Sequence, residues 1–206
     1  MTSAAGVHLA EPRVAPANSE ENTMFSDVMI DLETLGTVPG CAIVSIGAVA
    51  FNEFEVQPTG FYQAVSIPEW SVAGLTPEGL HKDESTIGWW QKQSSEARRV
   101  FEEGHFSTRV VLSLLADYIS DIGSPRVWGN GADFDNPIVA AAAHKVGLNP
   151  KSIWKGYNGR CYRTVKSQFQ DIKLVRTGTH HNALDDAISQ AQHMVRICQN
   201  RGWRLC

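Results

Sequence analysis

The chain has 206 residues, long enough to bury one substantial core, and 43% of them are hydrophobic, which excludes a wholly disordered protein. No apolar stretch is long enough to span a bilayer, and the N-terminal segment lacks the apolar core of a signal peptide, so we expect no membrane association. The formal net charge of −4 excludes an indiscriminate binder of polyanions, so local positive charge or bound metal must hold any nucleic-acid partner.

The N-terminal part of the sequence predicts a flexible tail followed by a β-meander. Residues 1–24 are rich in Ala, Pro, Ser, Asn and Glu and contain no aromatic residue, which is typical of a flexible segment. Residues 25–206 are expected to form one folded domain. Its first three strands are predicted at apolar runs rich in Val, Ile and aromatic residues: DVMID (27–31), CAIVSIGAVAF (41–51) and FYQAVSI (61–67).

Helical patterns then alternate with one short strand. The strand is predicted at residues 126–130 (RVWGN), before an Ala-rich helix at residues 135–147 with Pro137 in its first turn. Further helices are predicted at residues 86–93, 94–103, 107–120, 160–169 and 182–200. In the helix at 107–120, the spacing predicts a buried face with Val110, Val111, Leu114, Leu115 and Tyr118. This order of elements predicts an α/β fold with a mixed central sheet, the antiparallel meander first, flanked by helices.

The spacing of the cysteines does not predict a metal site, but it bears on the cellular location of the protein. Cys41, Cys161, Cys198 and Cys206 form no closely spaced pair of metal ligands. Reduced thiols in a cytoplasmic protein are the simplest interpretation, so we expect a cytoplasmic location.

Two acids stand where the first predicted strand runs into a loop. Asp31 and Glu33 are two residues apart, so their side chains leave the same face of a strand. Removing an ionised carboxylate from water costs several kcal/mol or more unless something compensates it, such as a bound cation, an arginine or a helix N-terminus. The alternative is a solvated strand end with no special role.

Two further acids lie at predicted helix starts. Asp135 follows the strand at 126–130, where it could instead cap the next helix. In the stretch THHNALDDA (179–187), Asn182 predicts an N-cap, and Asp185 can reach back as a capping-box acid. Asp186 has no such local role and lies beside the apolar side of the last helix.

Four acids at the ends of separate elements match what two divalent cations require. Mg²⁺ prefers carboxylate oxygens, and two such cations ~3.5–4 Å apart can stabilise the attacking and leaving oxygens of a phosphoryl displacement. His181 stands five residues before Asp186. A histidine with a pKa near neutrality can remove a proton from the attacking water.

The stretches DLET, NGADFD and HNALDDA, in this order, resemble the three exonuclease motifs of the DnaQ-like superfamily of 3′–5′ exonucleases, in its DEDDh branch. The resemblance covers about residues 27–200, and IGWWQKQSSEAR (87–98) further looks like phage and prophage exonucleases of this superfamily. It implies a ribonuclease H-like fold for the predicted mixed sheet.

Carried over residue by residue, the resemblance implies a site with two divalent cations, Mg²⁺ or Mn²⁺. Their ligands would be the acids of the three motifs: Asp31, Glu33, Asp135 and Asp186. The His-x4-Asp spacing selects His181 rather than His180 as the general base. Asp133 is the alternative to Asp135, because Asn130 stands one residue further away than in the usual N-x2-F-D pattern. The resemblance also implies that Thr34 and Leu35 contact the terminal nucleotide.

The implied activity is metal-dependent 3′–5′ hydrolysis of single-stranded nucleic acid at its 3′ end, releasing nucleoside 5′-monophosphates. The phage resemblance favours DNA as substrate, and the host cytoplasm as the location if the protein is phage-encoded. Two alternatives stay open: an exoribonuclease of the same superfamily, and a non-catalytic nucleic-acid-binding module that retains the fold. Trp89 and Trp90 could stack on bases or pack in the core, and the basic stretch at 151–181 could be a solvated face or a path for phosphates. The sequence does not specify an oligomeric state.

Overall fold

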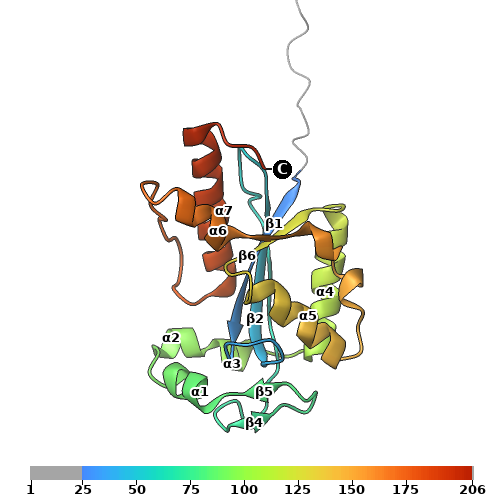
Figure 1. Ribbon diagram of the computed structural model, residues 1–206. Helices are drawn as coiled ribbons and strands as arrows, with labels where there is room; N and C mark the ends of the chain where they lie inside the picture. The colour runs from blue at the N-terminus through green and yellow to red at the C-terminus, as the bar shows by residue number, and fades with distance from the viewer. Residues whose placement is uncertain (1–24, 206) are drawn as a thin grey trace, which may run out of the picture.

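The centre of the protein is a mixed five-stranded sheet with the strand order β3-β2-β1-β6-β7 (Figure 1). This computed structural model describes residues 25–205, so the tail expected at 1–24 lies outside the described residues. The antiparallel meander is formed by β1 (Asp27–Thr34), β2 (Ile43–Phe51) and β3 (Phe61–Ala64). β6 (Arg126–Gly129) and β7 (Gly159–Cys161) extend the sheet in parallel with β1. The expected α/β class is confirmed.

Helices cover both faces of this sheet. α7 (Ala183–Arg201) and α6 (Tyr162–Gln168) lie on one face, and α4 (Thr108–Asp121) and α5 (Asp135–Lys145) lie on the other (Figure 1). Successive side chains of a strand point to opposite faces. Along β1, Val28, Ile30 and Leu32 therefore join the core that contains α4 and α5, whereas Met29 joins the core that contains α7. The side chains of Asp31 and Glu33 point to the same face of the sheet as Met29, the face that α7 covers.

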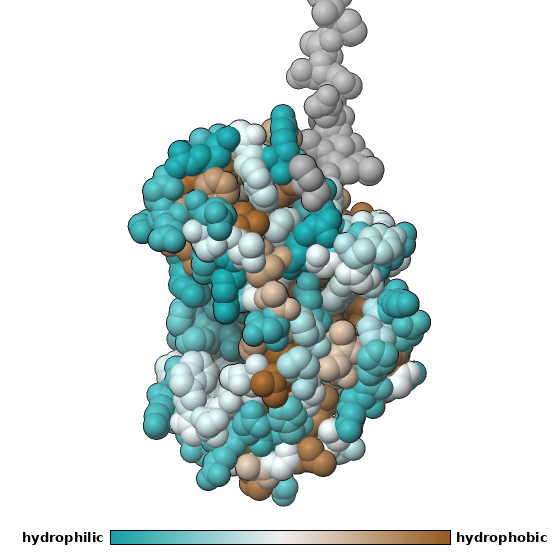
Figure 2. Space-filling model, in the orientation of Figure 1, coloured by the Kyte–Doolittle hydropathy of each residue, from teal (hydrophilic) through white to brown (hydrophobic). Residues whose placement is uncertain are grey.

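The remaining elements build one end of the molecule and the connections around the sheet. The end drawn at the bottom of Figure 1 contains a short ribbon and three short helices: β4 (Gly74–Leu75), β5 (His81–Lys82), α1 (Glu84–Trp90), α2 (Ser95–Arg98) and α3 (Val100–Glu103). Two 3-10 helices, η1 (Pro150–Ser152) and η2 (Gly156–Asn158), connect α5 to β7. Hydrophilic residues cover most of the visible face, with small hydrophobic patches near its centre (Figure 2). Within residues 25–205, no helix has the length and apolar character needed to cross a membrane.

The predicted buried face of α4 is only partly correct. Val111 and Leu115 are buried as expected, but Val110 and Leu114 are 41% and 36% exposed. The helix instead buries Leu112 and Ile119 against the sheet. Apolar residues on more than half of the helix circumference leave its rotation undetermined by pattern, so packing against the sheet decides it.

α7 approaches the sheet closely at Gly47 of β2. Gly47 pairs with Asp31 across the β1–β2 ladder. A Cβ atom at this position would lie 2.2 Å from the backbone of Ala183 and Leu184, which no side chain tolerates. Glycine therefore allows the first turn of α7 to lie directly on the sheet beside Asp31.

Gly47→Ala is expected to push the start of α7 away from the sheet. We expect a loss of about 1–3 kcal/mol in the free energy of unfolding, as is usual when a well-packed core is overfilled. Thermal or urea unfolding measures this loss. Gly88→Ala is the matched control, because a Cβ there meets no atom within 4 Å and alanine favours a helix such as α1. Equal stability of both variants would show that α7 does not depend on the close approach at Gly47.

Candidate active site

The first pair of acids lies at the end of β1, on the face covered by α7. Asp31 is half-buried and Glu33 is 8% exposed. The β1–β2 register shifts between Glu33 and Thr34, which is the local irregularity of a β-bulge. Bulges beside functional sites redirect side chains. Gln190 of α7 donates a hydrogen bond of 2.6 Å from Nε2 to Oδ1 of Asp31, so this carboxylate is held from the α7 side.

Asp135 lies near the β1 acids because β6 runs parallel to β1, with Met29 and Trp128 as the last paired residues, so the chain leaves β6 close to Asp31. A Cβ at Gly129, the last residue of β6, would lie 2.8 Å from Cβ of Asp135, so glycine permits the tight turn into α5. Oδ1 of Asp135 accepts from the backbone N–H of Leu32 at 3.2 Å, and Oδ2 accepts from that of Asn130 at 2.6 Å. Asp135 is buried and lies close to the β1 acids, whereas the alternative, Asp133, is exposed.

The start of α7 brings the third-motif acid to the cluster. Oδ1 of Asn182 accepts hydrogen bonds from the backbone N–H groups of Leu184 and Asp185, which confirms the predicted N-cap. Asp185 accepts from the backbone N–H of Thr179 at 2.7 Å, so it secures the preceding loop and does not complete the capping box expected from the sequence. Asp186, one residue further on, is 8% exposed and lies beside Glu33.

His181 faces the acids, and His180 does not. Nδ1 of His181 lies 4.0 Å from Oε1 of Glu33. Glu33, His181 and Asp186 each offer one possible ligand atom, and these atoms lie within 4.8 Å of one another. The backbone of His181 has a φ of +64°, an uncommon left-handed conformation for a residue other than glycine, which turns its ring out of the helical path. His180 is exposed, and its ring contacts that of His181 with centroids 3.9 Å apart.

Burial and mutual repulsion perturb the acids strongly. Burial raises the pKa of Asp31 well above its ordinary value, and the other three carboxylates raise it further. Burial raises the pKa of Glu33 to about 8, with contributions from Asp186 and Asp135. Burial also raises the pKa of Asp135 to about 6, although the N–H groups of Asn130 and Leu32 oppose this. Burial lowers the pKa of His181, and neighbouring His180 acts in the same direction.

This group of side chains suits hard divalent cations. The donor atoms of the four acids are all carboxylate oxygens, which Mg²⁺ and Mn²⁺ prefer and softer metals do not. Burial raises the pKa values of Asp31, Glu33 and Asp135, and neighbouring carboxylates raise those of Asp31 and Glu33 further, which indicates excess negative charge in the cluster. Bound cations would remove this excess.

The residues after the acid pair lie deeper than expected for a nucleotide contact. Leu35 is fully buried, its N–H donates to Ala42 and its carbonyl accepts from Asp83. The Thr34 hydroxyl donates to the carbonyl of Gly36 at 2.6 Å. A contact between the Leu35 side chain and a base would require Leu35 to leave the core. The contact of Thr34 and Leu35 with the terminal nucleotide stays a prediction.

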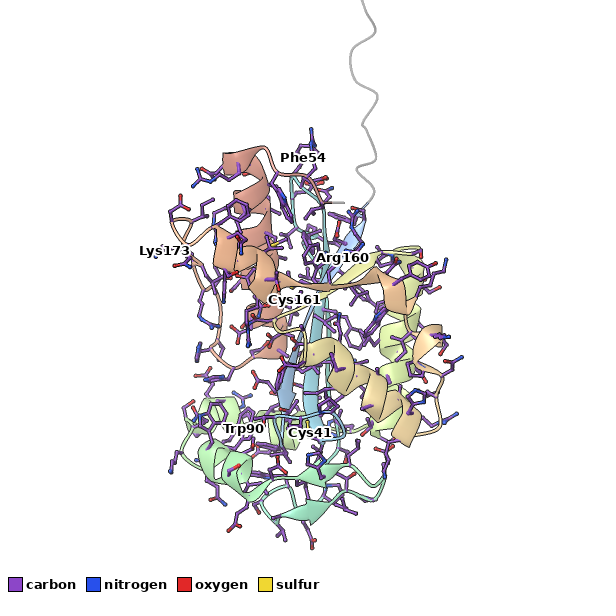
Figure 3. The ribbon with its side chains drawn as sticks, viewed as in Figure 1. Cys41, Phe54, Trp90, Arg160, Cys161 and Lys173 are labelled. Atoms are coloured by element: carbon purple, nitrogen blue, oxygen red, sulfur yellow. The ribbon has the colours of Figure 1, made fainter. Side chains whose placement is uncertain are left out.

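The two adjacent tryptophans have different environments. Trp90, labelled in Figure 3, is fully buried. Its Nε1 donates to the carbonyl of Thr34, the last residue of β1, at 2.9 Å. Trp89 is 40% exposed and meets the ring of His181 at right angles, with centroids 4.9 Å apart. One ring thus supports the first motif from the core, and the other lies against the histidine.

Sequence reasoning missed two residues that touch the acids. Gln190 binds Asp31, and Arg176 forms an ion pair between its Nη1 and Oδ1 of Asp186. Gln190 lies one helical turn after Asp186, a spacing that places it on the same face of α7 and could have indicated it. Arg176 belongs to the basic stretch at 151–181, but nothing in that stretch distinguishes it from the other cations.

Glu33→Gln is expected to stabilise the protein in the absence of metal. The raised pKa means that the folded state holds more protons than the unfolded chain between pH 4.5 and about 8, so the contribution of Glu33 to stability falls as the pH rises through this range. The advantage of the variant should grow over the same range to the order of 2 kcal/mol. Thermal unfolding in EDTA measures it.

Two comparisons complete this test. Mg²⁺ should raise the melting temperature of the unmodified protein more than that of Glu33→Gln, because the cation relieves the same repulsion. Asp133→Asn, which neutralises an exposed acid nearby, should leave the pH profile unchanged. A Glu33→Gln variant that is less stable than the unmodified protein at pH 8 would contradict the interpretation of the cluster.

Comparison with known proteins agrees with this site. Residues 26–198 match the model of the Rv2179c-like domain family, described as a 3′–5′ exoribonuclease domain. An exodeoxyribonuclease of Enterobacteria phage T4 is 30% identical over 175 residues, which cover 74% of each chain. The chain is thus similar in sequence both to a family described as exoribonucleases and to a protein named as an exodeoxyribonuclease.

Solved structures show the same fold at low sequence identity. E. coli Exonuclease I in complex with a dT13 oligonucleotide has a TM-score of 0.58 at 11% identity; the match covers 86% of this chain but 41% of Exonuclease I. The nuclease domain of 3′hExo, a DEDDh family member bound to rAMP, has a TM-score of 0.58 at 14% identity, over 87% and 94% of the two chains. S. pombe Pop2p, in a form with bound Mg²⁺ and Mn²⁺, has a TM-score of 0.59 at 12% identity, over 86% and 84%.

These matches confirm the ribonuclease H-like fold and identify an exonuclease, not the non-catalytic module considered from the sequence. The family match spans the whole central sheet and all three motifs. The chain belongs to the Rv2179c-like 3′–5′ exoribonuclease domain family, within the DnaQ-like superfamily of DEDDh 3′–5′ exonucleases.

Proposed function

We propose that the protein hydrolyses the terminal phosphodiester bond at the 3′ end of single-stranded nucleic acid, using two divalent cations, and releases nucleoside 5′-monophosphates. The observation that carries this proposal is the convergence of four carboxylates and His181 at one edge of the sheet. The acids come from three separate parts of the chain, so their proximity is not a consequence of sequence neighbourhood. The raised pKa values of Asp31, Glu33 and Asp135 support a site built for cations.

The acids of the three motifs would hold the cations, Mg²⁺ or Mn²⁺: Asp31, Glu33, Asp135 and Asp186. Bound there, the cations would neutralise the charge of the phosphate and activate water. His181 takes the proton of the attacking water as the general base, because its lowered pKa keeps the ring neutral at physiological pH. Trp89 and Glu33 border this ring on two sides and restrict its orientation.

For the substrate we favour single-stranded DNA over RNA. The named phage relative is an exodeoxyribonuclease, and it is similar to this chain over most of its length. RNA is the second candidate, because the matching family is described as exoribonucleases. Recognition of a 2′-hydroxyl can depend on a single contact, so the fold alone does not choose between them.

We also propose a cytoplasmic location. Cys41, Cys161 and Cys198 are free thiols, as is usual in a reducing compartment.

Cleavage of matched strands tests the function directly. DNA and RNA oligonucleotides of one sequence, labelled at the 5′ end, are incubated with Mg²⁺, with Mn²⁺ and with EDTA. We expect stepwise shortening from the 3′ end, 5′-mononucleotides as products, no reaction in EDTA and faster cleavage of DNA. Faster cleavage of RNA would reverse the substrate proposal, and release of 3′-mononucleotides would contradict the mechanism.

Replacing single acids by alanine tests the ligand set. We expect Asp31→Ala, Glu33→Ala, Asp135→Ala and Asp186→Ala each to remove most of the activity while the protein stays folded, measured by initial rates and circular dichroism. Asp133→Ala should retain near-normal rates, because Asp133 is exposed and lies outside the cluster. The opposite outcome for Asp133 and Asp135 would mean that Asp133 is the ligand.

The two adjacent histidines provide a matched pair for the general base. His181→Ala should lower the rate by about two to four orders of magnitude, the usual effect of a positioned acid–base group, whereas His180→Ala should have little effect. Because burial lowers the pKa of His181, the rate should rise with pH, and the midpoint of this rise should lie below the ordinary histidine pKa. The rise of the rate with pH should be much weaker in His181→Ala. An inactive His180→Ala beside an active His181→Ala would assign the base to His180.

A further inference from the structure

The loop between α6 and α7 brings a cation directly to the acid cluster. Nη1 of Arg176 pairs with Oδ1 of Asp186. The side chain of Arg176 is 50% exposed, whereas that of Asp186 is 11% exposed. The pair therefore joins a solvent-accessible, adjustable cation to a carboxylate fixed in the first turn of α7. The charge of Arg176 also lowers the pKa of Glu33, so it acts on more than one acid.

Arg176 also has positive neighbours on α6. Arg163 and Lys166 stand three residues apart on α6, which places them on one face of that helix. Burial lowers the pKa of Lys166, and the charges of Arg163 and Arg176 lower it further, so the three cations lie close together. Arg163 also reaches the second motif, because its guanidinium carbon lies 3.6 Å from where a Cβ of Gly131 would be. Together the three residues form an arc of positive charge from the second motif to the third.

A divalent cation and Arg176 compete for the negative charge of Asp186. Oδ1 of this carboxylate accepts from Nη1 of Arg176, and a cation bound to the carboxylate would repel the guanidinium. If Arg176 leaves Asp186, it stands beside Arg163 and Lys166 and faces additional positive charge. Such an arrangement is unfavourable until an anion arrives. The anion that the proposed reaction supplies is the phosphodiester backbone of the substrate strand.

We propose that Arg176 is a substrate-positioning residue that exchanges Asp186 for a backbone phosphate of the strand when divalent cations bind. This inference rests on the proposed function, because it needs both the cations and the strand. In this structure, Arg176 pairs with Asp186 and supplies positive charge at the cluster. Once a cation is held by Asp186, Arg176 would turn toward Arg163 and Lys166, and a phosphate of the strand would become its partner. Metal binding and strand binding are therefore coupled through one side chain.

Calorimetric titration with Mg²⁺ alone, without any strand, tests the first half. Arg176→Gln should bind Mg²⁺ about fivefold more tightly than the unmodified protein, since it removes a competitor for Asp186 whose pairing is of ordinary strength. Lys173→Gln is the matched control, because it makes the same charge change in the same loop. Lys173 is exposed and lies on the outer edge of the molecule (Figure 3), so the Mg²⁺ affinity of this variant should equal that of the unmodified protein. Arg176→Met is a second neutral variant that keeps the apolar stem, should Arg176→Gln fail to fold.

Fluorescence anisotropy with a short 5′-labelled oligothymidylate tests the second half. All variants are measured in the His181→Ala background with Mg²⁺ present, so that binding is observed without turnover. Arg176→Gln should weaken strand binding about tenfold, the range of a charge-assisted phosphate contact, while Lys173→Gln changes it little. The opposite signs of the two effects are specific to an exchange, since a merely structural role for Arg176 would weaken both.

The outcomes separate this inference from the proposed function. Equal or weaker Mg²⁺ affinity in the Arg176 variants, or strand affinity equal to that of Lys173→Gln, overturns the exchange and leaves the exonuclease intact. An unmodified protein that binds no Mg²⁺ and shortens no oligonucleotide overturns the proposed function itself. Tighter Mg²⁺ binding together with weaker strand binding supports the exchange.

Discussion

The burial and the mutual repulsion of carboxylates at the end of β1 are the constraint on which the site depends. Asp31, Glu33 and Asp135 all favour protonation in the folded protein, since their pKa values are raised by burial. A cluster of this kind lowers stability in the absence of cations. The surrounding sheet and helices must therefore be stable enough to hold the acids together against their repulsion. Functional sites commonly hold such locally unfavourable arrangements, which the rest of the fold compensates.

Close backbone packing makes this convergence possible. β6 runs parallel to β1 and ends beside the middle of that strand, and Gly129 lets α5 begin immediately there. Gly47 lets α7 lie on the sheet opposite Asp31. A third support comes from the end built by α1, where the buried Trp90 holds the carbonyl of Thr34. The site is thus formed by elements from nearly the whole described chain, and changes in remote packing can move its side chains.

The fold class and the element order were largely predictable from the sequence. The long apolar strands and amphipathic helices produced clear patterns, and the comparisons confirm the superfamily to which the three short motifs pointed. Strands β4, β5 and β7 were not predicted, because two or three residues contain no periodicity to detect. The rotation of α4 was misjudged for a related reason: its apolar residues surround much of the helix, and only contact with the sheet selects the buried ones.

The sequence by itself determined which residues have the chemistry of the site and their local geometry: two acids on one face of a strand, an acid at a helix start, and a histidine before an N-cap. Only the tertiary structure decided what surrounds them. In the tertiary structure, Asp135 is buried whereas Asp133 is exposed, and Leu35 lies in the core. Gln190 binds Asp31 although the two residues are 159 positions apart in the sequence. The tertiary structure also places Arg176 against Asp186. The reason is physical: side-chain periodicity reports the direction in which a residue points within its own element, whereas its partners and burial are set by how separate elements pack.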